Sequence, residues 1–351
     1  MFAIGVDLGG TNLRIAAVDS GGRMLEKITL GTKVVRGRET VIHDMCSSIQ
    51  ALVERFGSSA GQLSGIGIGV PGIIEMQTGM LRESPNLPGW SDYPVREEIE
   101  RRLGTRVVLE NDANAAALGE KWLGAAAEVD DMCMITLGTG VGGGLVLGGR
   151  VFHGMRGMAG ELGHINVDPD GPPCGCGSNG CLEQYASATA IKRMAMEAIA
   201  SGAAPELERA MSEDPEFSSK GVYQMAVQGD APAREIFGKA GRALGIVIAD
   251  LINIFNLPMY VIGGGVSSAW EAFAPAIFEQ VRRNSFVYRA TAPPEQTGGM
   301  PATNVQDPAC RHTVITRALL GSDAGLFGAA RLPMMAQHDA AKATLQDLKR
   351  A

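Results

Sequence analysis

The segment Gly160–Glu183 reads GELGHINVDPDGPPCGCGSNGCLE and places one histidine, three cysteines and two glutamates within two dozen residues. One histidine and three cysteines form a ligand set that is typical of a closed zinc site. The candidate ligands are His164, Cys174, Cys176 and Cys181. A glycine beside each cysteine permits the tight turns that bring three sulfurs together. We therefore predict a structural zinc site, because four protein ligands leave no position for a reactive water.

Two other interpretations of these thiols are open, namely that they are merely buried or that they pair as disulfides. Neither explains a histidine close upstream or a glycine beside every cysteine. The remaining cysteines, Cys46, Cys133 and Cys310, are scattered along the chain. We interpret them as ordinary core or surface thiols that stay reduced.

Length and charge narrow the class of protein. A chain of 351 residues is long for one hydrophobic core and predicts two domains. A formal charge of -7 and the absence of a basic run argue against a nucleic-acid partner. The sequence has neither a long apolar run nor the charged lead of a signal peptide, so we expect a cytoplasmic protein that contacts no membrane.

The N-terminal region predicts a hairpin with a glycine turn. A short apolar strand from Phe2 leads into Asp7-Leu8-Gly9-Gly10-Thr11, and an alternating second strand follows. Adjacent glycines free backbone N–H groups to face a phosphate, and Thr11 and Asp7 offer a hydroxyl and a carboxylate near a bound Mg2+. A plain hairpin turn is the alternative. The spacing and the lysine of a Walker loop are absent.

A related pattern returns about 130 residues later, as a strand over Met132–Leu137 that runs into GTGVGGG. Two such units predict a duplicated fold with two phosphate-facing hairpins, here called the first glycine hairpin (Asp7–Thr11) and the second glycine hairpin (Gly138–Gly140). A third glycine turn, Gly263–Ser267, follows a strand and opens a helix, where a phosphate or a flat ligand can bind.

Two polar positions between the hairpins are candidates for substrate chemistry. Asn86 lies in the loop SPNLPGW and can both donate to and accept from a hydroxyl, although a solvated asparagine is the plainer interpretation. Asp112 follows a strand over Val107–Glu110 and begins an alanine-rich helix that extends to about Trp122. Aspartate is favoured as an N-cap, and a carboxylate stabilised there can also accept a proton from an attacking hydroxyl. Both interpretations can hold together.

Other segments carry less information. We expect Ser201–Lys220 to be a mobile excursion and Ala290–Arg311 to be a surface loop. A last helix is expected over about Asp323–Arg331, with a frayed polar remainder from Gln337.

Taken in order, DLGGT, the VPG turn, ENDANAAA, LGTGVGGG, the GELGH to GCLE segment and IGGGVS resemble the ROK family of sugar kinases and repressors over nearly the whole chain. The resemblance implies an α/β fold of the actin-like (sugar kinase and heat-shock ATPase) type, with an active-site cleft between two domains. It places residues 1–111 with 322–336 in a small N-terminal domain and 112–321 in a large C-terminal domain that carries the zinc loop. It also implies ATP, Mg2+ and a hexose, and a homo-oligomer, because related kinases are commonly dimers or tetramers.

The resemblance assigns roles to individual positions. Asp112 matches the catalytic base. The residues that match sugar contacts, here called the hexose-contact residues, are Asn86, Asn111, Asp112, Glu161, His164 and Glu183. The positions that match the phosphate and nucleotide contacts are Asp7, Gly9, Gly10, Thr11, Gly138, Thr139, Gly140, Gly264 and Gly265. Arg14 stands where many relatives have lysine, and it receives no role.

The implied reaction is phosphorylation of a sugar 6-hydroxyl, with Asp112 as base. The loop around Asn86 resembles the glucokinase branch and favours glucose. N-acetylmannosamine, N-acetylglucosamine, mannose and fructose stay open as substrates, because specificity depends on the shape of the pocket. Two further classes are a sugar-responsive transcriptional regulator that lacks its DNA-binding domain and a chaperone-like ATPase. The first strand begins at Phe2 and leaves no room for a helix-turn-helix, and an ATPase has no use for glutamates braced by zinc.

Overall fold

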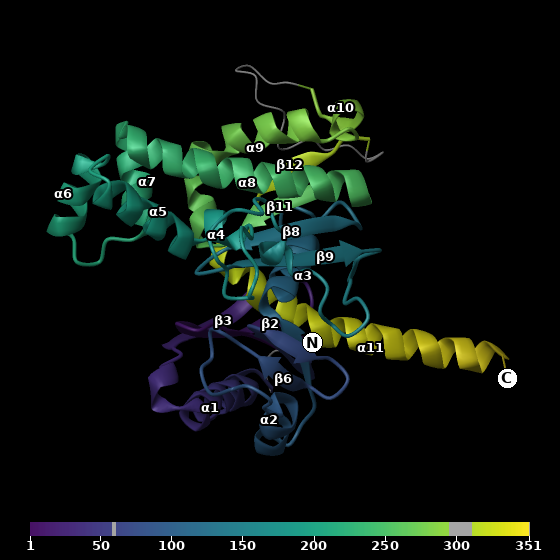
Figure 1. The fold of residues 1–351 in the computed structure, drawn as a ribbon. Coiled ribbons are helices and arrows are strands. Elements are labelled where there is room, and N and C mark those ends of the chain that lie inside the picture. Colours follow the sequence, from purple (N-terminus) through teal and green to yellow (C-terminus); the bar gives the residue numbers. More distant parts are fainter. Residues whose placement is uncertain (58–60, 295–310, 351) are drawn as a thin grey trace. The chain divides into compact units, whose positions relative to one another are not determined.

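The computed structural model describes residues 1–57, 61–294 and 311–350, with side chains through residue 338 (Figure 1). The chain forms two compact units, each described by itself. Unit 1 comprises Met1–Asp130, Gly144–Gly160 and Ser322–Ala351, and unit 2 comprises Asp131–Gly143 and Glu161–Gly321. The domain bounds expected from the sequence stay a prediction.

Unit 1 is built on a five-stranded sheet with the order β3-β2-β1-β4-β7. Strands β1 to β3 pair antiparallel, whereas β4 and β7 extend the sheet in parallel. The strands are β1 (Phe2–Leu8), β2 (Asn12–Asp19), β3 (Met24–Gly31), β4 (Leu63–Val70) and β7 (Val107–Asn111). A separate ribbon consists of β5 (Ile73–Glu75) and β6 (Met80–Glu83). The helices are η1 (Val34–Arg36), α1 (Arg38–Gly57), α2 (Val95–Leu103), α3 (Asp112–Leu123), η4 (Gly321–Asp323) and α11 (Ala324–Arg350).

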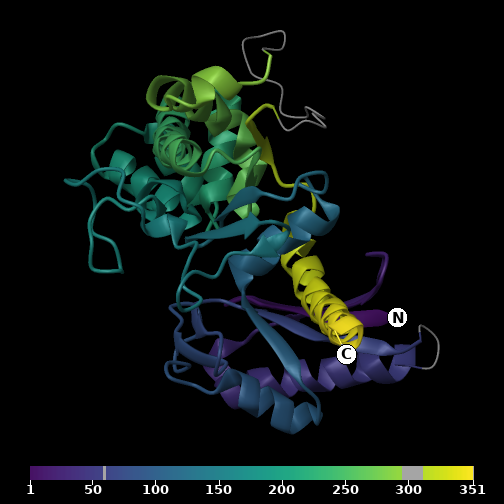
Figure 2. The ribbon, with the colours of Figure 1, turned by 90° about the vertical axis from the view of Figure 1, so that its right-hand side faces the viewer.

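The two faces of this sheet are packed differently because side chains alternate along each strand. Large residues of β1, such as Phe2 and Ile4, point into the core that α1 covers. Helix α11 covers the opposite face of this sheet (Figure 2). There the strands contribute small residues such as Ala3 and Ala16 to the cluster that α11 joins. A Cβ at Gly5 would lie 2.2 Å from the Leu326 carbonyl oxygen, and one at Gly67 would lie 1.9 Å from that of Ala329. Glycine therefore lets α11 lie directly on the strands.

Helix α11 extends well beyond the expected end at Arg331, and the expected fraying from Gln337 is wrong for the backbone, which stays helical to Arg350. The continuation follows from contacts with β4. The Gln337 side-chain amide donates a 2.7 Å hydrogen bond to the Ser64 carbonyl, and Pro333 fills the space above Gly65. The polar sequence of this segment does not by itself determine a helix, and these contacts with β4 keep the segment helical.

The second sheet has the order β10-β9-β8-β11-β12. Its strands are β8 (Met132–Leu137), β9 (Val141–Leu147), β10 (Arg150–Val151), β11 (Met259–Gly263) and β12 (Val314–Arg317), and β9 passes from unit 2 into unit 1 after Gly143. The two sheets share one topology. In each sheet three strands that are consecutive in the sequence lie side by side, and two later strands extend the sheet in parallel beyond the first of the three. The predicted duplication is therefore confirmed.

In unit 2 helices α8 and α9 pack against each other, and α4, α5, α7 and α10 contact α8. The described helices of this unit are η2 (Leu162–His164), α4 (Glu183–Ala186), α5 (Ala188–Ala200), α6 (Pro205–Glu213), α7 (Ser219–Gln228), α8 (Ala231–Phe255), η3 (Gly265–Ala269), α9 (Trp270–Asn284) and α10 (Tyr288–Thr291). The segment Ser201–Lys220 contains α6 and the start of α7, because Pro205 starts α6 and the buried Leu207 anchors it. Its mobility stays a prediction. The expected surface loop begins within α10, and its residues 295–310, with Cys310, lie outside the described part of the chain. None of the helices in the described residues has the length and apolar character that a membrane crossing requires.

Candidate active site and metal centre

The predicted zinc ligands meet in unit 2. The ligand atoms of His164, Cys174, Cys176 and Cys181 all lie within 4.8 Å of one another. The Cys176 and Cys181 sulfurs are 3.7 Å apart, as are the Cys174 sulfur and Nδ1 of His164. Tetrahedral zinc with bonds of about 2.3 Å separates two sulfurs by about 3.8 Å, so these residues fit the metal. All five described cysteines are free thiols, which removes the disulfide interpretation for them.

Backbone turns bring the three sulfurs together. The backbone N–H of Cys174 donates to the Ser178 carbonyl at 2.7 Å, and Val167 N–H donates to the Gly180 carbonyl at 2.8 Å. Gly180 has φ +60, and a Cβ there would lie 1.6 Å from the Asp168 carbonyl oxygen. Only glycine fits this position.

The cysteines at the metal centre differ in electrostatic environment. Burial raises the pKa of the Cys181 thiol to about 12, whereas a backbone hydrogen bond from Ser178 lowers the pKa of Cys176. A bound cation would favour the thiolate form of both, because metal ligation requires deprotonated sulfur.

The two ring nitrogens of His164 have different neighbours. One faces the cysteine sulfurs, and the other faces Glu161. Nδ1 is the nitrogen near Cys174, and Nε2 lies 4.0 Å from the Glu161 carboxylate. Metal at Nδ1 leaves the proton on Nε2, where it can be donated to a ligand hydroxyl. Both side chains are accessible, at 37% for His164 and 50% for Glu161.

Glu183, the third hexose-contact residue of unit 2, lies against the second glycine hairpin. Its Oε2 accepts a 2.9 Å hydrogen bond from the backbone N–H of Val141. The third glycine turn also lies near this hairpin: Gly264 has φ +82, and a Cβ there would be 2.4 Å from the Leu137 carbonyl oxygen. Gly265 faces open space. The structure therefore brings together the predicted phosphate, nucleotide and sugar positions of unit 2.

In unit 1, Asp112 is the first residue of α3, but the N-cap is Asn111. The Asn111 side-chain oxygen accepts from the N–H groups of Ala113 and Asn114, and its amide donates to the Gly72 carbonyl at 3.2 Å. The N-cap interpretation of Asp112 is therefore wrong. Asp112 Oδ1 accepts from Ala113 N–H at 2.9 Å, within the first turn of α3.

The first glycine hairpin places Asp7 beside Arg14, its cross-strand partner, with 2.9 Å between Oδ2 and Nη1. Burial raises the pKa of Asp7, and Arg14 opposes that shift. Asp7 supplies the oxygen ligand type that Mg2+ prefers. A Cβ at Gly10 would lie 2.9 Å from the Asn86 carbonyl oxygen, so this hairpin also packs against a hexose-contact residue. Thr11 is exposed.

Sequence reasoning missed Glu110 and His153. Glu110 is 1% exposed, and its carboxylate accepts from Asn111 N–H at 3.0 Å and from the Asn114 amide at 3.1 Å. Its second oxygen lies 2.7 Å from Nε2 of His153. A charged residue at the end of an otherwise apolar strand was the available signal.

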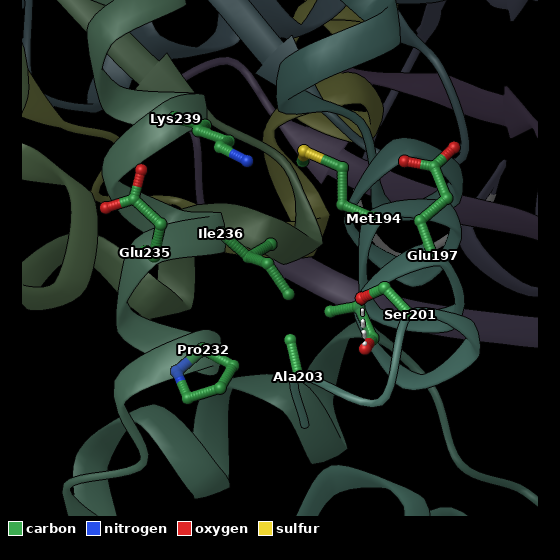
Figure 3. Close-up of a pocket in the computed structure, with 9 residues that line it drawn as sticks. Met194, Glu197, Ser201, Ala203, Pro232, Glu235, Ile236 and Lys239 are labelled. Carbon is green, nitrogen blue, oxygen red and sulfur yellow. Dashed lines mark hydrogen bonds between the residues drawn. The ribbon is translucent and has the colours of Figure 1, made fainter. Parts of the chain in front are cut away.

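A cavity of about 390 Å3 lies between α5 and α8 (Figure 3). Met194, Ile236 and Lys239 line it, with Glu197 and Glu235 at its edges. Both glutamates are paired on their own helices, with Arg193 and Arg242 respectively. None of the predicted site residues lines this cavity.

Comparison with known proteins identifies the family in which this arrangement of residues occurs. A family model described as "ROK family" matches residues 3–335. A glucokinase of Thermotoga maritima is 40% identical over 278 residues, which cover 79% of this chain and 86% of that protein. A glucokinase of Halalkalibacterium halodurans is 36% identical over 326 residues, 93% of this chain and 92% of that protein.

A solved structure is also similar. It is a ROK family glucokinase from Streptomyces griseus in complex with glucose and AMPPNP, with TM-score 0.73 and 35% identity, and the match covers 95% of this chain and 99% of that one. The predicted fold class, an actin-like α/β fold, is confirmed by this likeness.

Proposed function

The chain belongs to the ROK family, and we propose that it is an ATP-dependent hexose kinase that converts D-glucose and ATP to glucose 6-phosphate and ADP. Relatives that cover most of the chain at 36% and 40% identity are glucokinases. The observation that carries the proposal is the arrangement of His164, which turns one ring nitrogen to three cysteine sulfurs and the other to Glu161. A metal-braced imidazole beside a carboxylate suits the recognition of sugar hydroxyls.

In the proposed mechanism Asp112 orients the sugar 6-hydroxyl and accepts its proton. The sugar oxygen attacks the γ-phosphorus in line, the bond from that phosphorus to the β–γ bridging oxygen breaks, and ADP leaves. Asn86, Asn111, Glu161, His164 and Glu183 hold the other hydroxyls. The backbone N–H groups of the two glycine hairpins bind phosphate oxygens, as Gly264 and Gly265 do for the nucleotide.

The bound metals would have separate roles. Asp7 would hold Mg2+, which would supply positive charge near the transferring phosphate. His164 and the three cysteines of the metal centre would hold zinc, which would brace the loop that presents Glu161 and Glu183 and take no part in bond making.

Several finer points belong to this proposal. Glucose is favoured over N-acetylmannosamine, N-acetylglucosamine, mannose and fructose on the strength of the relatives named above. A homodimer or tetramer working in the cytoplasm is proposed, and the free thiols of the described cysteines are consistent with a reducing compartment.

A panel of sugars assayed for ADP release with ATP and Mg2+ tests the proposal. The expected result is negligible release without sugar and the highest kcat/KM with glucose, with the phosphate at O6 when the product is identified by NMR. A preference for N-acetylmannosamine would make it an amino-sugar kinase instead. Equal release with and without sugar would indicate an ATPase and overturn the proposal.

A further inference from the structure

Each glycine hairpin touches a hexose-contact residue of its own unit. In unit 1 a Cβ at Gly10 would lie 2.9 Å from the Asn86 carbonyl oxygen and 3.2 Å from the Asn86 Cβ. In unit 2 a Cβ at Gly140 would lie 2.3 Å from Oε2 of Glu183. In both places the missing side chain of a phosphate-hairpin glycine is replaced by part of a sugar-site residue.

The contact in unit 2 is also a hydrogen bond. Glu183 Oε2 accepts the Val141 N–H at 2.9 Å, directly after the hairpin turn. Hydrogen bonds to an ionised carboxylate are stronger than neutral ones. A carboxylate has two oxygens, so Glu183 can hold the hairpin with Oε2 and present Oε1 to a sugar hydroxyl.

The start of α5 holds the same hairpin from its carbonyl side. The backbone N–H of Ala188 donates to the Gly138 carbonyl at 2.8 Å, and the Thr189 hydroxyl donates to the Thr139 carbonyl at 2.8 Å. Carbonyl oxygens repel phosphate, so hydrogen bonds that keep them turned to α5 favour a turn whose N–H groups serve an anion.

Helices α4 and α5 are in turn joined to each other. Arg193 donates to the Gln184 carbonyl at 2.7 Å, and the Ser187 hydroxyl caps α5 by accepting from Ala190 N–H at 3.0 Å. The segment 183–189, here called the α4–α5 clamp, therefore contacts the hairpin at Gly138, Thr139 and Val141 as one connected piece.

We propose that the α4–α5 clamp couples the hexose and nucleotide sites inside unit 2, with Thr189 as a positioning residue for the hairpin. The inference rests on the proposed function, since it takes Glu183 as a sugar contact and the hairpin as a phosphate contact. A hexose that orders Glu183 also orders Val141 and the turn before it, so glucose increases nucleotide affinity. By linkage the nucleotide increases glucose affinity by the same factor, typically about 5- to 150-fold.

The sharpest test substitutes one glycine of the second glycine hairpin and measures the affinity for glucose. Gly140→Ala places a methyl group where the Glu183 carboxylate now lies, at an ordinary backbone conformation, so the carboxylate must move. We expect the glucose Kd, measured by calorimetry without nucleotide, to rise about tenfold. The matched control is Gly57→Ala, at the last residue of α1 and outside the predicted site, where an added Cβ would meet no atom within 4 Å. Its glucose Kd without nucleotide should stay within about twofold of wild type. Equal glucose Kd values for both variants would overturn the coupling.

A second test alters the α4–α5 clamp at Thr189 and measures the affinity for the nucleotide. Thr189→Val keeps the shape and removes the hydroxyl that donates to Thr139. We expect weaker binding of a non-hydrolysable ATP analogue with Mg2+, an unchanged glucose Kd without nucleotide, and restoration by Thr189→Ser. The factor by which glucose tightens analogue binding should fall towards one in Gly140→Ala. A factor equal to that of wild type would contradict the proposal.

Glu183→Ala distinguishes a failure of the sugar role of Glu183 from a failure of the coupling. If this variant binds glucose as wild type does, the sugar role of Glu183 fails, and the coupling fails with it. If it loses glucose binding while Gly140→Ala and Thr189→Val leave both ligands unaffected, the sugar role stands and only the coupling is wrong. Far-UV circular dichroism and thermal melts of each variant verify that a lost affinity reflects the site.

Discussion

The Glu110 carboxylate and the His153 ring nitrogen lie 2.7 Å apart, which ties the segment after β10 to strand β7, which ends at Asn111 directly before Asp112. Glu110 is buried and His153 is partly exposed, at 38%. The buried carboxylate thus receives its third hydrogen bond from a residue that can titrate near neutral pH.

This pair predicts a pH-dependent stability. The hydrogen bond that His153 donates to the Glu110 carboxylate raises the pKa of His153 above its ordinary 6.5. A histidine whose pKa is higher in the folded than in the unfolded state stabilises the fold. This stabilisation is complete when the pH lies below the unfolded-state pKa, and it is lost as the pH rises through the folded-state pKa. In urea denaturation, the unfolding free energy of wild type should exceed that of His153→Gln more at pH 6 than at pH 9. The same difference in a Glu110→Gln background should not vary with pH, and a pH-independent cost in both backgrounds would refute the pairing.

Arg14, unassigned from the sequence, should matter through Asp7. Arg14→Gln leaves a largely buried carboxylate without its cation, which should cost about 1–3 kcal/mol of unfolding free energy at pH 7. The pKa of Asp7 is already raised by burial, so the folded state tolerates the protonated acid and the cost should shrink as pH falls towards 4. Denaturation at both pH values measures this. Arg23→Gln, which breaks an exposed pair with Asp19, is the control and should change stability by less than about 1 kcal/mol. A pH-independent loss in Arg14→Gln would contradict the role assigned to the pair.

Local pattern predicted the parts of the molecule that neighbouring residues determine. The strand pairs beside the glycine turns and the zinc ligands lie within short stretches, so alternation and spacing were enough. The length of α11 was not predictable in this way, because Gln337 contacts Ser64 from a distant part of the chain. Glu110 and His153 were missed for the same reason, since 43 positions separate them.

The zinc centre should be structural. Cys181→Ser removes a buried ligand, so metal content by mass spectrometry should fall from about one zinc ion per chain, and the thermal midpoint should drop. Glucose KM should rise about tenfold or more, because Glu161 and Glu183 flank the loop, with a smaller effect on ATP KM. Cys46→Ala, which alters a buried thiol of α1, is the control that should retain metal and glucose KM. Full activity in metal-free Cys181→Ser would exclude this role.

The role of Asp112 as the base is tested by comparing glucose binding and glucose 6-phosphate formation between wild type and Asp112→Asn. The substitution keeps the shape at the first position of α3 and removes the basic carboxylate. We predict that Asp112→Asn has a glucose Kd within about threefold of wild type and a kcat lower by about 10^2- to 10^4-fold. A kcat near that of wild type would contradict it.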